Sequence, residues 1–174
     1  MSKTKLSVRD MCYCACFSAL MAVCAQLQIP AFGVPVTLQT FGVLMALGVL
    51  GGKWGTIAVL LYLFMGMAGL PVFSGFQGGA AVLLGPTGGF LWGFLLGGIV
   101  YRMTEKMGKF PASVLCQLTC YFCGCLWFRY WAGGVGFGAA VLTCVVPYLI
   151  PDGLKLWLAW HLSGRIGRQL KWKE

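Results

Sequence analysis

The chain has 174 residues, of which 59% are hydrophobic and only 10% are charged. Soluble domains carry about a quarter charged residues, so this composition excludes an ordinary soluble domain. The apolar stretches are continuous rather than alternating, which excludes a membrane β-barrel and predicts an all-α membrane protein. The net charge of +9 comes from 13 basic and 4 acidic residues. In a membrane protein, basic residues mark cytoplasmic loops, and nucleic acid is not expected as a partner.

The apolar stretches predict one integral membrane domain over residues 1–174, with six transmembrane helices. The expected spans are 9–28, 36–51, 54–70, 87–103, 111–131 and 151–167. No small-residue cleavage site follows the first stretch, so we interpret it as a helix and not as a signal peptide. Pro30 ends the first span and Pro71 ends the third. Pro151 opens the last span, where a missing N–H costs nothing.

The distribution of basic residues predicts the orientation of the chain. Eleven of the 13 would lie on one side of the membrane: Lys3, Lys5, Arg9, Lys53, Arg102, Lys106, Lys109, Arg165, Arg168, Lys171 and Lys173. We therefore expect both the N- and the C-terminus to be cytoplasmic, and we do not expect residues 137–150 to be a seventh crossing. The two remaining basic residues, Arg129 and Lys155, map to the outer ends of spans, beside Asp152.

Asp152 and Lys155 are charged residues within a strongly apolar segment. A charge at membrane depth costs about 2.5–3.5 kcal/mol and usually faces a functional cavity. The two residues are three positions apart, so they share one helical face, and the helix dipole stabilises a carboxylate in the first turn. The alternative is an ion pair that only satisfies itself. Arg129 has two interpretations: it binds a substrate carboxylate, or it extends to the outer headgroups.

Two of the connections expected on the outer side, the first and the third, are uncharged and apolar. The first offers Thr37 and Gln39 at a helix start, and the third offers Phe73 and Gln77 among sharp turns. Such loops favour lids that fold over a pocket, and the alternative is simple burial in the helix bundle. The residues alone therefore predict an outward-facing pocket for a small, largely apolar solute that carries a carboxylate or an amide-like group.

Small residues recur at helical spacing on two spans. A stripe on the fourth span, expected to allow close internal packing, consists of Gly85, Gly89, Gly93 and Gly97. Ala15 and Ala19 form a shorter pair on the first span. That pair either packs internally or faces a partner protein, and spacing does not distinguish the two.

Several kinds of chemistry have no support in the sequence. The nine cysteines are expected to pack as small hydrophobic residues and not to bind metal, and no cofactor is expected. No phosphate-binding Gly-x-x-x-x-Gly-Lys-[Ser/Thr] motif occurs, so no ATP site is evident. The one histidine, His161, has no serine or carboxylate at a recognisable catalytic spacing.

Four stretches carry a resemblance to a known family: Pro35-Val-Thr-Leu-Gln-Thr40, Gly69-Leu-Pro-Val-Phe-Ser-Gly75, Leu84-Gly-Pro-Thr-Gly-Gly-Phe90 and Leu149-Ile-Pro-Asp-Gly-Leu-Lys155. In their order and spacing they resemble the BioY family, the biotin-specific substrate-capture (S) components of energy-coupling factor (ECF) transporters. The third and fourth stretches are the more specific. The fifth span carries no recognisable family motif, so Arg129 stays a candidate on its charge alone.

The resemblance implies a six-helix S-component fold in a bacterial plasma membrane, surrounded by lipid, that binds biotin near the outer face. It implies docking through Ala15 and Ala19 onto a transmembrane coupling subunit driven by two ATPase subunits. By position, Asp152 and Lys155 are expected to contact biotin. The further residues expected around the pocket are Thr37, Gln39, Phe73, Gln77, Gly85, Thr87, Phe90 and Tyr148.

Three alternatives stay open at this point. The chain is an S component for another vitamin, an intramembrane enzyme that uses His161 and a cysteine, or an assembly protein held together by its glycine stripes. The last alternative predicts no saturable ligand and no need for Asp152 or Lys155.

Overall fold

The computed structural model describes residues 7–29 and 36–170, and both ranges are dominated by helices. In chain order the elements are α1 (Val8–Gln26), β1 (Gln28–Ile29), β2 (Val36–Thr37), α2 (Gln39–Met67), α3 (Ala80–Leu84), α4 (Gly88–Thr104), η1 (Glu105–Met107), α5 (Lys109–Trp131), α6 (Phe137–Cys144), η2 (Val146–Tyr148) and α7 (Leu149–Gln169). The helices follow the expected spans to within about a turn, which confirms the all-α fold. The residues named above that fall outside the described ranges are Lys3, Lys5, Pro30, Pro35, Lys171 and Lys173.

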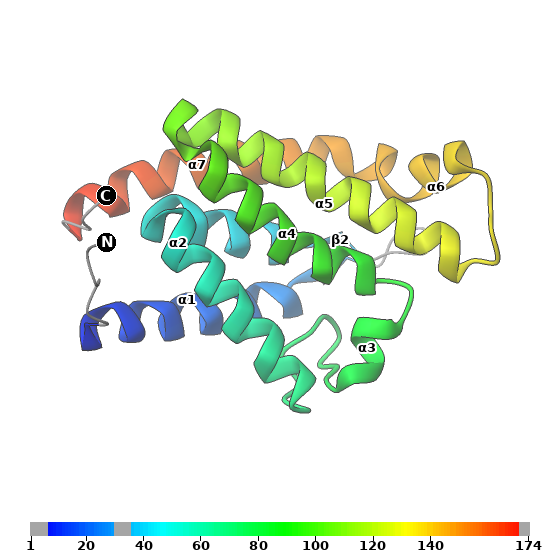
Figure 1. Cartoon of the computed structure of the whole chain (residues 1–174), viewed down its shortest axis with the longest axis horizontal. Helices are drawn as coiled ribbons and strands as arrows, with labels where there is room; N and C mark the ends of the chain where they lie inside the picture. The colour runs from blue at the N-terminus through cyan, green and yellow to red at the C-terminus, as the bar shows by residue number, and fades with distance from the viewer. Residues whose placement is uncertain (1–6, 30–35, 171–174) are drawn as a thin grey trace.

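The second and third expected spans form one element, α2, in which the chain reverses direction at Gly51. This residue has φ 76° and ψ 169°, a conformation that glycine adopts without strain. A Cβ added to Gly55 would lie 2.7 Å from the Cα of Leu47, whereas eight residues of straight helix span about 12 Å. The two arms, 39–50 and 52–67, therefore fold back on each other (Figure 1).

Glycine residues allow α4 and α5 to pack in close contact. An added Cβ would lie 2.2 Å from an α5 atom at Gly89, 3.0 Å at Gly93 and 2.9 Å at Gly97. Larger side chains would force the helices apart, so the predicted internal packing is confirmed for these three residues. Gly85 is a correction to the predicted stripe, because it caps α3 and precedes the first residue of α4.

The lengths of the helices decide which of them are able to cross a membrane. By length and composition, four helical stretches in the described ranges are sufficient: Val8–Gln26, Gln39–Met67, Lys109–Trp131 and Phe137–Gln169. Gln39–Met67 reaches this length only as one element, because its two arms, 39–50 and 52–67, run in opposite directions and are each shorter than α4. The 17 residues of α4 extend about 26 Å, slightly less than the ~30 Å hydrocarbon core. The 8 residues of α6 extend only about 12 Å, so this helix is too short to be a crossing of its own.

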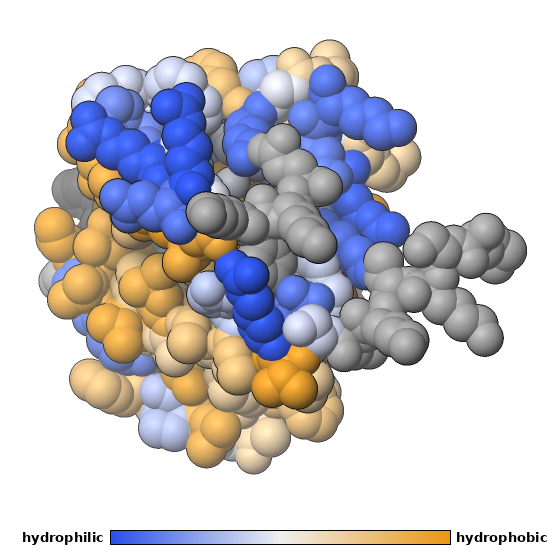
Figure 2. Space-filling model, turned by 90° about the vertical axis from the view of Figure 1, so that its left-hand side faces the viewer, coloured by the Kyte–Doolittle hydropathy of each residue, from blue (hydrophilic) through white to orange (hydrophobic). Residues whose placement is uncertain are grey.

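The described basic residues that were expected on one side do lie at one end of the molecule. The start of α1 and the end of α7 meet there (Figure 1), and Arg9 Nη2 donates a hydrogen bond to the carbonyl of Leu170 at 2.5 Å. The turn of α2 meets η1 there too, since the Gly52 N–H donates to Glu105 Oε2 at 2.6 Å. Figure 2 views this end and shows hydrophilic side chains gathered on it, whereas α3 and α6 lie at the opposite end.

Candidate functional site

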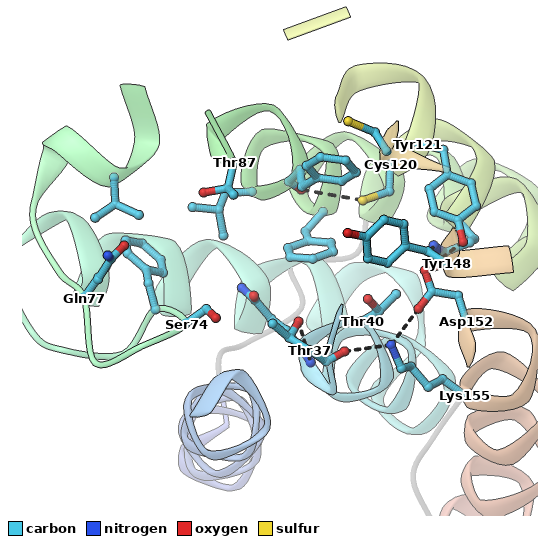
Figure 3. Close-up of a pocket in the computed structure, with 18 residues that line it drawn as sticks. Thr37, Thr40, Ser74, Gln77, Thr87, Cys120, Tyr121, Tyr148, Asp152 and Lys155 are labelled. Atoms are coloured by element: carbon cyan, nitrogen blue, oxygen red, sulfur yellow. Dashed lines mark hydrogen bonds and ion pairs between the residues drawn. The ribbon is translucent and has the colours of Figure 1, made fainter. Parts of the chain in front are cut away.

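A cavity of about 90 Å³ lies where α2, α4 and α7 begin, against the middle of α5. Aromatic rings form much of its wall, contributed by Phe73, Phe90, Phe94 and Tyr148. The charged side chains of Asp152 and Lys155 lie on one side of the cavity, and the neutral polar side chains of Ser74, Gln77 and Thr87 lie on the other (Figure 3). The arrangement suits a small ligand with an apolar body and polar groups at its ends.

Asp152 and Lys155 form a buried ion pair on one face of α7. Their exposed fractions are 6% and 8%, and Lys155 Nζ lies 2.6 Å from Asp152 Oδ1. Lys155 Nζ also donates to the carbonyl oxygen of Thr37 at 2.7 Å. Thr37 is held in place by the antiparallel β1–β2 pair, in which it faces Gln28. The ammonium group therefore connects the last helix to the segment between α1 and α2.

Helix α5 supplies two more partners to the same carboxylate. Tyr121 Oη donates to Asp152 Oδ2 at 2.7 Å, and Gln117 Nε2 donates to the same oxygen at 3.2 Å. Gln117 and Tyr121 are four residues apart, so they share one helical face, and both are buried. With Lys155, three donors surround Asp152. Neither α5 residue was predicted from the sequence, although two polar side chains four positions apart in an apolar span indicate a polar helix face.

A second polar pair connects the cavity wall to the loop above it. Gln39 Nε2 donates to Tyr62 Oη at 2.8 Å, and the Tyr62 hydroxyl donates to the carbonyl of Val72 at 3.1 Å. Gln39 is only 5% exposed and lines the cavity. These hydrogen bonds satisfy buried polar groups and join the two arms of α2 to the segment that follows them.

Residues 68–79, which we call the covering loop, lie over the cavity and are fixed to it by Phe73. This ring is 1% exposed and meets Tyr62 edge to face, with 5.6 Å between the ring centroids. Gly66 provides the space for it, because a Cβ added there would lie 2.1 Å from the Phe73 ring. The covering loop is therefore seated on α2 by an aromatic residue that also lines the cavity.

The end of α1 also holds the covering loop. Gln26 Nε2 donates to the carbonyl of Phe73 at 3.0 Å, and Gln26 Oε1 accepts from the N–H of Phe76 at 2.8 Å. Ser74 Oγ donates to Gln28 Oε1 just beyond the helix. Both ends of one side-chain amide thus bond the loop backbone, so this connection between α1 and the covering loop is direct.

Nine of the 11 predicted binding residues line the cavity: Thr37, Gln39, Phe73, Gln77, Thr87, Phe90, Tyr148, Asp152 and Lys155. Gly85 does not line it, and its carbonyl accepts a hydrogen bond from Trp127 Nε1 at 2.8 Å. Arg129 is exposed near the end of α5 and does not line it either. Ala15 and Ala19 are exposed on α1. Side chains outside this set of 11 complete the lining: Thr40, Ser74, Val82, Leu91, Phe94, Gln117, Cys120, Tyr121 and Cys144.

The remaining reactive side chains lie apart from this polar cluster or pack as hydrophobic groups. His161 is exposed and stacks on Trp157, with 5.7 Å between the ring centroids. All nine cysteines fall within the described ranges as free thiols, and 6 of them are buried. Within residues 7–29 and 36–170, no three His, Cys, Asp or Glu side chains come close enough to hold a metal ion.

Comparison with known proteins gives a consistent result along nearly the whole chain. The BioY family model matches residues 1–172. A probable biotin transporter BioY of Pyrococcus horikoshii is 35% identical over 161 residues, which cover 92% of this chain and 98% of that protein. The biotin transporter BioY of Thermotoga maritima is 38% identical, with coverages of 91% and 96%.

A solved structure has the same fold. The crystal structure of the S-component for biotin from an ECF-type ABC transporter superposes with a TM-score of 0.83 and 26% identity. The match covers 100% of this chain and 96% of that one.

Proposed function

This chain belongs to the BioY family, and on that premise we propose that it is the biotin-capturing S component of an ECF transporter. It is a transporter subunit and not an enzyme. It takes up biotin at the outer face of the membrane and delivers it across with a coupling subunit and two ATPase subunits. The absence of an ATP motif from the sequence agrees with hydrolysis by other chains.

The observation that carries this proposal is the polar cluster around Asp152. Biotin has a cyclic urea with two N–H donors and one carbonyl acceptor, fused to an apolar sulfur-containing ring. A carboxylate has about four lone-pair sites and an ammonium group has three N–H donors. Three donors reach Asp152 and two acceptors receive Lys155 among the described residues. One acceptor site and one donor are therefore left for a urea N–H and a urea carbonyl.

The charges in the cavity favour one orientation of the ligand. Asp152 and Lys155 neutralise each other, so a carboxylate placed beside them would find no unpaired cation. Burying an unpaired carboxylate is costly, whereas a neutral urea meets both a donor and an acceptor there. We therefore place the ring system of biotin against this pair and the aromatic wall, with the acid chain pointing towards Gln77 and Thr87.

The orientation in the membrane follows from the ends of the molecule. We propose six crossings, counting the two arms of α2 separately, in a bacterial plasma membrane with both termini cytoplasmic. Support comes from the basic end described above, because positive residues accumulate on the cytoplasmic side. The cavity lies away from that end and would then face outward.

The side of α1 that points away from the other helices is the proposed docking surface for the coupling subunit. Ala15 and Ala19 are exposed there, and residues this small allow a second helix to approach closely. Lipid covers the surface in the absence of the partner.

The test is binding of biotin to the purified protein and to two variants. Asp152→Asn and Lys155→Ala each remove a charged hydrogen-bond partner worth about 1.5–3 kcal/mol, so affinity should fall at least about tenfold. Arg129→Ala is the matched control, since this charge is exposed outside the cavity. Size-exclusion chromatography confirms that each variant is intact. Wild-type affinity in both cavity variants would refute the assigned site.

A panel of other vitamins, measured on the same samples, tests the substrate. Tighter binding of any of them than of biotin would identify an S component of different specificity. A chain that binds none of them saturably would support the assembly-protein alternative.

A further inference from the structure

A second, larger hollow adjoins the cavity on its outer side. This outer cleft has a volume of about 580 Å³. Four residues line both the cleft and the cavity: Ser74, Gln77, Val82 and Thr87. The two spaces therefore share a wall made by the covering loop, α3 and the turn that precedes α4.

The shared wall lies on the side of the cavity away from the ion pair. Figure 3 shows Ser74, Gln77 and Thr87 on one side of the cavity and Tyr121, Asp152 and Lys155 on the other. A ligand that bonds the ion pair at one end and is longer than the cavity would extend towards this wall. In the orientation argued above, that end of biotin is its carboxyl group.

The outer cleft is neutral and is lined largely by small residues. Four of its lining residues contribute little or no side chain: Gly75, Gly78, Ala81 and Gly85. Its polar groups are side-chain hydroxyls and side-chain amides, and one of these amides belongs to Gln28. No charged side chain is among the described residues that line it. A site without a cation has no charged group with which to prefer a carboxylate over an amide. Strong discrimination requires a buried polar partner that the wrong ligand leaves unpaired.

We propose that the site also accepts biotin whose carboxyl group is joined as an amide to a small polar group, such as the side-chain amine of a free lysine. The biotin ring occupies the cavity, and the amide extension passes between the side chains that line both spaces, Ser74, Gln77 and Thr87 among them, into the outer cleft. The substrate class is then biotin together with its small carboxyl amides. This inference rests on the proposed function, because it assumes that biotin is the ligand of the cavity.

The test compares biotin with its lysine amide on the purified protein and on two variants of α3. Ala81→Trp fills the outer cleft, since Ala81 lines it. Ala80→Trp is the matched control: Ala80 is also exposed, is the neighbouring residue of the same helix, and lines neither space.

We expect the wild-type protein to bind the amide within about tenfold of biotin, as a neutral cleft implies. Ala81→Trp should lower the affinity for the amide relative to that for biotin by at least about tenfold through steric exclusion, and Ala80→Trp should leave that ratio unchanged. Biotin binding without amide binding, or an Ala81→Trp variant with the wild-type ratio, would overturn the inference and leave the proposed function standing. Failure of biotin itself to bind would overturn both.

Discussion

Replacing Lys155 alone is expected to destabilise the protein more than replacing both members of the ion pair. Asp152 and Lys155 are 6% and 8% exposed, so Lys155→Met leaves a buried carboxylate without its cation. Removing one member of a buried pair costs about 3–5 kcal/mol, whereas replacing both members is often neutral. Tyr121 and Gln117 still donate to the carboxylate in the variant, which favours the lower value of about 3 kcal/mol.

The expected shift is measurable by thermal unfolding in detergent without biotin. For a chain of this size, each kcal/mol changes the Tm by about 2–4 °C, so Lys155→Met should unfold about 6–12 °C below the wild type. The double variant Asp152→Asn, Lys155→Met keeps an acceptor oxygen for Tyr121 and Gln117. It should regain most of the stability without regaining biotin binding. A wild-type Tm for Lys155→Met, or a double variant as unstable as the single one, would refute this reasoning.

Two further predictions concern the covering loop and the rate at which biotin dissociates, measured by chasing labelled with unlabelled biotin. Gly66→Ala should raise that rate at least about tenfold, because the new methyl group would lie 2.1 Å from the Phe73 ring. Gly164→Ala adds a methyl group with no neighbour within 4 Å and should change nothing; equal rates for the two would contradict the seating of the loop. Gln26→Leu loses three hydrogen bonds to the loop, together worth about 1.5–4.5 kcal/mol, and should raise the rate at least about tenfold. An unchanged rate would mean that other contacts hold the loop.

Two of the site residues could be identified from physical chemistry alone, because their presence in lipid is costly, whereas residues such as Phe90 and Tyr148 were expected from the family resemblance. Asp152 and Lys155 stand out because a charge in an apolar span needs a partner and a cavity. Glycine spacing on the fourth span was also informative, since Gly89, Gly93 and Gly97 do contact α5. In both cases the physical constraint acts within one helix, so it can be seen in the order of the residues.

The contribution of α5 could not be predicted in the same way. Gln117 and Tyr121 form a polar face on α5, but they are neutral, and nothing within this helix indicates that the face meets Asp152. Which face of α5 meets Asp152 depends on its packing against the α4 glycines, a contact between distant parts of the chain. The same packing explains why Arg129 does not line the cavity. Arg129 lies eight residues beyond Tyr121 on α5, so the two side chains point about 80° apart around the helix axis. A charged residue near the expected outer end of a span therefore does not have to line the cavity.

The side-chain amide of Gln26 couples the movement of α1 to that of the covering loop. The outer face of α1 is largely free of intramolecular contacts, with Val8, Met11 and Val23 exposed by 76%, 56% and 61%. At its far end the same helix bonds the loop backbone on both sides of Ser74. Tilting α1 away from the bundle must therefore either carry the loop with it or break these bonds. In this molecule, force applied to one peripheral helix is transmitted directly to the cover of the pocket.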